Sequence, residues 1–154
     1  MKKLFIIILL SFSIPSFADK TDAKDEWTQK TIIGLWSMME AYDEANVLDL
    51  KDNGKATLYL FKCDNKNKTY TSAGDEKYTY EIKKGELLLK ELGKRDVSYR
   101  LNIKRPSIVT MELQYNMPNS ELDKITLFYI KNREIKPLCT YIAKNMVERN
   151  RTKN

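Results

Sequence analysis

Apolar and polar residues alternate along much of this chain. The pattern is cleanest over residues 77–83, where Tyr78, Tyr80 and Ile82 alternate with polar side chains, and it recurs over 97–104 and 108–115. Successive side chains of a β-strand point to opposite faces of the sheet, so a sustained period of two predicts a strand with one buried face. Further strands are predicted at 33–36, 47–50, 55–63, 86–91 and 124–131.

Short turn signals separate these segments. Asn53-Gly54 is the strongest, because both residue types tolerate positive φ, and Pro106 favours another turn. Consecutive strands with short connections are usually neighbours in a sheet, and closing the sheet removes its exposed edges. We therefore predict an all-β fold, an eight-stranded antiparallel up-and-down barrel, with a two-sheet sandwich as the alternative. The polar segment 64–75 is predicted to be a long loop.

The spacing of apolar residues changes after Pro137. The apolar residues that follow recur along one face of a helix, so a short C-terminal helix is predicted to complete a barrel domain over 31–148. These residues are Leu138, Cys139, Ile142, Ala143, Met146 and Val147. The remaining residues, 149–154, form a basic tail.

The N-terminal residues have the three parts of a secretory signal peptide. Lys2 and Lys3 precede the apolar run 4–10, and Ser16 and Ala18 supply the small residues for cleavage. A bilayer span needs about 20 apolar residues, and no stretch approaches that length, so we expect no transmembrane segment. We predict a signal peptide over 1–18 and a polar leader over 19–30, in which Trp27 could cap the core. The product would be periplasmic or secreted.

The charge balance does not indicate a nucleic-acid partner. Loss of Lys2 and Lys3 would reduce the 27 basic residues to 25, against 21 acidic ones. Such a mild and dispersed excess is typical of a solvated, Lys-rich surface. We expect a monomer.

Two cysteines remain after processing, Cys63 and Cys139. In an oxidising compartment the default is a disulfide, with two separately buried thiols as the alternative. A bond closing a loop of this length would stabilise the fold by roughly 4 kcal/mol in the chain-entropy treatment.

The first predicted strand carries Gly34-Leu35-Trp36. A Gly-x-Trp before seven further strands, a helix after the last strand and a helix cysteine that can pair with an early strand resemble the lipocalin (calycin) family. The resemblance implies that Gly34 and Trp36 close one end of the barrel. It also implies that an Arg near the end of the last strand packs over the Trp, and Arg133 has about the right position.

The chain lacks the residues of most catalytic and metal sites. It contains no His, which removes the usual general base and the commonest zinc ligand. Its five glycines are scattered singly, so no phosphate-binding loop is present. Carboxylates cluster at 40–44 and 75–76, where charge is normally solvated. We expect no enzyme activity, no catalytic residues, no metal and no cofactor.

Aromatic residues carry the most informative chemistry. Five inward positions are the candidate ligand-binding residues: Tyr78, Tyr80, Tyr99, Met111 and Tyr115. Apolar rings with a few hydroxyls suit a small apolar or amphiphilic ligand, but the same side chains could simply fill the core of an eight-stranded barrel. The first hypothesis is therefore a non-enzymatic binding protein for such a molecule. The alternative is an inhibitor or immunity-type protein whose loops, 64–75 and 116–123, bind a cell-wall hydrolase or toxin.

Overall fold

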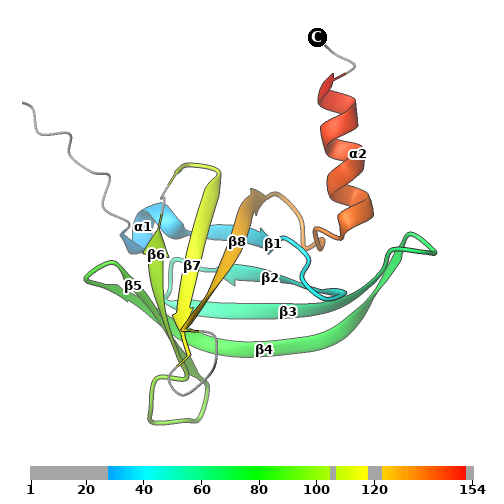
Figure 1. Cartoon of the computed structure of the whole chain (residues 1–154). Helices are drawn as coiled ribbons and strands as arrows, with labels where there is room; N and C mark the ends of the chain where they lie inside the picture. Colours follow the sequence, from blue (N-terminus) through cyan, green and yellow to red (C-terminus); the bar gives the residue numbers. More distant parts are fainter. Residues whose placement is uncertain (1–27, 105–106, 118–122, 152–154) are drawn as a thin grey trace, which may run out of the picture.

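The computed structural model describes residues 28–104, 107–117 and 123–151, with side chains up to residue 145. Eight strands form one closed barrel in which each strand is antiparallel to the next and β8 returns to β1 (Figure 1). This confirms the predicted up-and-down barrel. The strands are β1 (Gly34–Met38), β2 (Glu44–Leu50), β3 (Lys55–Asp64), β4 (Thr69–Lys83), β5 (Glu86–Glu91), β6 (Tyr99–Lys104), β7 (Thr110–Asn116) and β8 (Lys124–Asn132). The helices are α1 (Gln29–Ile32) and α2 (Thr140–Arg151).

Up-and-down connectivity sends alternate turns to opposite ends of the barrel. The turns after β2, β4 and β6 lie at the end where α1 leads into β1, which we call the closed end. The turns after β1, β3, β5 and β7 lie at the other end, which we call the open end.

Large apolar side chains from all eight strands pack into one cluster inside the barrel. On β4, Tyr78 and Tyr80 are buried whereas Lys77, Thr79 and Glu81 are exposed. The period of two therefore marks the inward face, as the sequence predicts. The cluster includes Trp36, Leu48, Leu50, Tyr78, Tyr80, Leu87, Leu89, Leu101, Met111, Leu113 and Tyr129.

Trp36 is fully buried and anchors the closed end. Its Nε1 donates a hydrogen bond of 2.7 Å to the Ile32 carbonyl at the end of α1, which satisfies the polar atom of the indole. Gly34 has φ +129°, and a Cβ there would lie 3.2 Å from Lys131 Cε. Gly34 thus begins the strand that carries Trp36, and the indole of Trp36 is held against the end of α1.

The cation over the Trp36 ring differs from the expected one. Lys131 Nζ lies 5.3 Å from the ring centroid, because Lys131 is the β8 residue that pairs with Trp36 in register. Arg133 follows the end of β8, and its side chain is exposed. The cation–π position assigned to Arg133 therefore belongs to Lys131.

The predicted loop over 64–75 is wrong in its second half. β4 begins at Thr69 and pairs with β3 back to Asp64, so the two strands form a long hairpin that extends beyond the barrel wall (Figure 1). We call residues 60–77 the arm. Every residue from 69 to 77 is exposed, so neither face of this segment needs apolar side chains. Apolar and polar residues therefore do not alternate here, and the strand could not be predicted from such alternation. The pairing shifts between Leu60 and Phe61, which marks a bulge in the arm.

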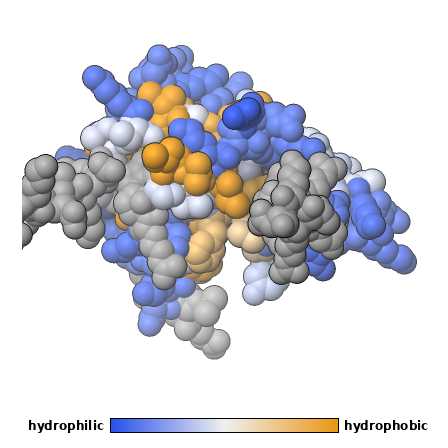
Figure 2. All heavy atoms as spheres, turned by 90° about the horizontal axis from the view of Figure 1, so that it is seen from above, coloured by the Kyte–Doolittle hydropathy of each residue, from blue (hydrophilic) through white to orange (hydrophobic). Residues whose placement is uncertain are grey.

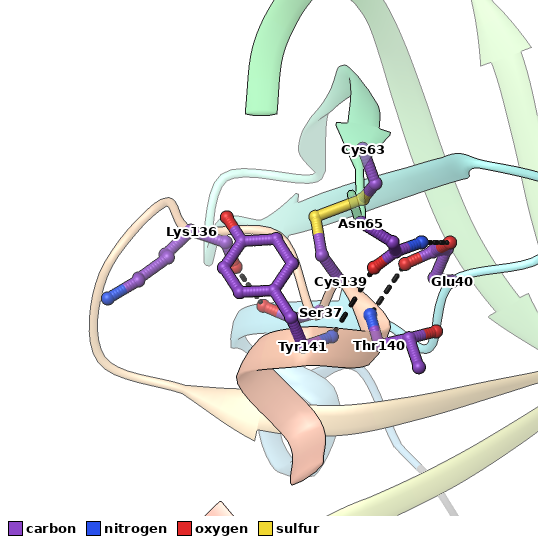
Figure 3. The surroundings of a disulfide bond; sticks show 8 residues. All are labelled: Ser37, Glu40, Cys63, Asn65, Lys136, Cys139, Thr140 and Tyr141. Carbon is purple, nitrogen blue, oxygen red and sulfur yellow. Dashed lines mark hydrogen bonds between the residues drawn. A yellow bond between two sulfur atoms is a disulfide. The ribbon is translucent and has the colours of Figure 1, made fainter. Parts of the chain in front are cut away.

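The predicted disulfide is present between Cys63 on the arm and Cys139. The C-terminal helix is also confirmed, but it begins at Thr140, so that Cys139 directly precedes it. With its sulfur committed to Cys63, Cys139 has no side-chain acceptor for the first helical N–H groups. Glu40 accepts the Thr140 N–H instead, and Asn65 Oδ1 accepts the Tyr141 N–H at 3.3 Å (Figure 3).

Apolar side chains also reach the outer surface. Met39, Phe128 and Ile130 are between 41% and 48% exposed. They are neighbours in space, because the Met39 N–H donates to the Phe128 carbonyl and β8 pairs with β1. Figure 2 shows apolar side chains gathered in a strip on the upper face, between hydrophilic ones.

Several predictions concern residues outside those described. They are the signal peptide 1–18, most of the leader including Trp27, and part of the 116–123 loop and of the basic tail. Within the part of the chain that is described, neither helix is long and apolar enough to cross a membrane.

Candidate functional site

The structure divides the five predicted ligand-binding residues into two groups. Tyr78, Tyr99 and Tyr115 come together: the ring centroids of Tyr78 and Tyr99 are 6.0 Å apart and those of Tyr99 and Tyr115 are 6.2 Å apart, with interplanar angles of 67° in both pairs. These are edge-to-face contacts of favourable geometry. We call the three residues the tyrosine series.

The other two residues belong to the packed core. Tyr80 Oη donates to the Lys51 carbonyl at 2.8 Å, in the turn after β2 at the closed end. Met111 is 1% exposed and pairs in register with Tyr129. Neither side chain has a free polar atom or open surface to offer a ligand, so the core-filling interpretation applies to both.

The tyrosine series runs from the core to the surface at the open end. Tyr78 is 2% exposed, Tyr115 is half-buried and Tyr99 is 40% exposed. Tyr99 also lines an open hollow of about 510 Å³ whose other walls are Glu91 and residues 94–98 in the turn after β5. Small-molecule pockets commonly measure about 300–1,000 Å³. An aromatic wall and a hollow of suitable size therefore meet at Tyr99.

Carboxylates accompany the phenols. Tyr78 Oη donates to the Glu76 carboxylate, and burial followed by the interaction with Glu76 raises the pKa of the Tyr78 phenol well above its ordinary value. The Lys94 ammonium pairs with Glu91 at the base of the turn. Its pKa is raised chiefly by that carboxylate, with smaller contributions from Tyr99 and Glu76.

The sequence analysis missed the turn residues of this hollow. The strand predicted over 97–104 begins only at Tyr99, so that Val97 belongs to the preceding turn. Val97 is 44% exposed and lines the hollow. The available signal was the run of three charged residues at 94–96, which lies between Glu91 at the end of one predicted strand and the inward-facing Tyr99 of the next.

Among the described residues, Glu40, Cys63 and Cys139 are close enough together to be considered as a metal site. Glu40 lies beside Cys63 and Cys139, but the disulfide uses both sulfurs. The Glu40 carboxylate is itself occupied by Asn65 and the Thr140 N–H. These atoms therefore serve the attachment of α2.

The chain matches no protein-family model, no curated protein and no solved structure. What can be compared with the lipocalins is the architecture, an eight-stranded antiparallel barrel with a C-terminal helix, which is compatible with a lipocalin-like fold.

Proposed function

We propose that this protein is a non-enzymatic, periplasmic or secreted binding protein of the lipocalin-like (calycin) type, which takes a small amphiphilic ligand at the open end of its barrel. The observation that carries the proposal is the tyrosine series, which leads from buried Tyr78 to exposed Tyr99 beside a hollow of about 510 Å³. The disulfide is in keeping with export, because such bonds persist in oxidising compartments.

The packed interior supports a site at the end of the barrel rather than at its centre. An eight-stranded barrel encloses room for side chains or one small ligand, and here Trp36, Tyr80 and Met111 are buried in one continuous cluster. At Tyr99 a ligand would instead meet an aromatic face that water already reaches. Covering that face removes apolar area from water at about 25 cal/mol per Å².

A neutral fluorescent amphiphile, N-phenyl-1-naphthylamine, tests this function. We expect saturable enhancement of its fluorescence by the wild-type protein, and about tenfold weaker binding by Tyr99→Ala, equivalent to about 1.4 kcal/mol. Tyr42→Ala is the matched control, because Tyr42 is fully exposed in the turn after β1 and has no part in the site. Equal affinity of wild type and Tyr99→Ala would contradict the proposal.

A second function, binding of a partner protein such as a cell-wall hydrolase or toxin, is favoured by the arm. β5 pairs with β4 from Tyr78 onward and the Leu92 N–H bonds to Lys77, so that in the described chain residues 69–76 pair with β3 alone. The Lys77 carbonyl accepts from the Leu92 N–H, which shows that it points away from β3. By the alternation of an antiparallel ladder, the backbone groups of Asp75 point the same way. A free strand edge of this kind can accept an extended segment of another protein.

Site-specific photo-crosslinking in the exporting cell tests the second function. A crosslinking residue at Tyr70 should give a discrete adduct that Asp75→Pro weakens, because proline removes the outward N–H. Asp75→Asn removes the charge and keeps that N–H, so it should leave the adduct intact. An adduct that both variants preserve would show that the strand edge is not used.

A further inference from the structure

We propose that the open end selects an organic cation, an amine or quaternary ammonium attached to an apolar body. This inference rests on the small-ligand function proposed above and narrows it to one chemical class. Three features of the described residues support it: the arrangement of the rings, the carboxylates next to them, and the position of the chain's own Lys94.

The tyrosine series provides surfaces that attract a cation. The face of an aromatic ring carries partial negative charge, and ammonium groups bind over it within about 6 Å of the centroid. Tyr78 and Tyr115 are each inclined by 67° to the central ring of Tyr99, so that the three rings form a bent wall rather than a flat stack. Such a wall presents more than one ring to a group lying against Tyr99.

Two carboxylates lie beside this wall. Glu76 accepts the Tyr78 hydroxyl, and Glu91 lines the hollow beside Tyr99. The Glu91 side chain is 42% exposed, so that water does not fully screen its charge, yet a ligand can reach it. An ammonium at Tyr99 would therefore combine ring contact with a nearby opposite charge.

Lys94 shows that the hollow beside Tyr99 accommodates an ammonium group. Its Nζ pairs with Glu91 across a tight turn, and the pKa of Lys94 is raised by Glu91 and, to a smaller extent, by Tyr99 and Glu76. The Lys94 side chain is 62% exposed and is held at its tip, so a ligand ammonium can displace it at low cost. Glu91, which lines the hollow, thus already binds an ammonium, the charged group of the proposed ligand.

The hollow also contains Arg95 and Asp96, so charge specificity has to be measured. The probes are phenyltrimethylammonium, its neutral isostere tert-butylbenzene and the anion benzenesulfonate, followed by NMR shifts of the tyrosine ring signals. We expect the cation to bind at least about threefold more tightly than either of the others.

The variants make the test specific. Lys94→Ala should raise the affinity for phenyltrimethylammonium several-fold, because it removes the competing ammonium. Glu91→Gln should lower that affinity, and Tyr99→Phe should preserve most of it, because the ring face remains. Lys90→Ala is the control: it removes one exposed cation from neighbouring β5 and should change nothing.

Tighter binding of benzenesulfonate, lost in Arg95→Gln, would overturn the proposal in favour of an anion site. An unchanged affinity in Lys94→Ala would also overturn it. If N-phenyl-1-naphthylamine binds at Tyr99 and the cation has no advantage, only the cation inference fails. If none of the four probes perturbs Tyr99, the small-ligand function fails with it.

Discussion

The two ends of the barrel use aromatic residues for different purposes. At the closed end, Trp36 and Tyr80 are buried and each donates its hydrogen bond to a backbone carbonyl, that of Ile32 and that of Lys51. At the open end, Tyr99 contacts two other rings and still remains 40% exposed beside a hollow. Position along the barrel, rather than residue type, therefore decides whether an inward aromatic supports the core or remains available to a ligand.

The largest effect should come from truncating the closed end. Trp36→Ala should lower the free energy of unfolding by about 3–5 kcal/mol, because it leaves a large cavity in the cluster. Tyr99→Ala should cost less than about 1 kcal/mol, since much of its ring is already in water. Urea unfolding of the two variants checks the difference. Equal losses would mean that the two ends are not distinct in the way described.

A smaller loss of stability is expected from removing the Cys63–Cys139 disulfide at the open end. Cys63→Ser combined with Cys139→Ser should cost about 2–4 kcal/mol, because the disulfide closes a long loop in the unfolded chain. The loss of protection should be concentrated in α2 and the arm, and hydrogen exchange can locate it. If the amides of β1 near Trp36 lose as much protection from exchange as those of α2, the disulfide stabilises the whole barrel rather than its open end.

The smallest effect on stability should appear in alkaline solution. There the dependence of the unfolding free energy on pH should distinguish tyrosines of the core from tyrosines of the surface. Burial raises the pKa of Tyr129 and Tyr80 above the ordinary value of 10.0. The unfolded chain loses these protons first, so the stabilisation is complete below about pH 10 and decreases as the pH rises above it. In Tyr129→Phe, the unfolding free energy should therefore fall less steeply with pH than in wild type, by about 1 kcal/mol per pH unit.

Unfolding free energies between about pH 8 and about pH 11 measure that slope. Tyr42→Phe is the control, because it removes the hydroxyl of a fully exposed tyrosine outside the core. A slope that is the same in wild type and Tyr129→Phe would show that the core phenol does not contribute.

Prediction from the sequence succeeded where burial is one-sided. The barrel, its order of strands, the disulfide and the C-terminal helix follow from alternation, turn residues and two cysteines. It failed for the first half of β4, where both faces of the strand are exposed and apolar residues therefore do not alternate with polar ones. Strand formers such as Thr69, Tyr70 and Thr71 were the remaining signal there.

The candidate site could be predicted only in part. The sequence identified Tyr78, Tyr99 and Tyr115 as inward-facing, but it could not separate them from Tyr80, because all four share one pattern. Their separation depends on the distance of each strand position from the open end, which is a property of the closed barrel. In the same way, Lys131 rather than Arg133 lies over Trp36 because of the register between β8 and β1.

The way in which α2 begins has a consequence for the order of folding. A short helix nucleates poorly alone, and this one receives its N-terminal acceptors from Glu40 and Asn65, which belong to the turns after β1 and β3. Those acceptors are in place only after three early strands have assembled. Formation of α2 thus depends on the early strands, so that a folded α2 reports a completed open end. A chain with a misassembled barrel would be left with a frayed, protease-sensitive α2.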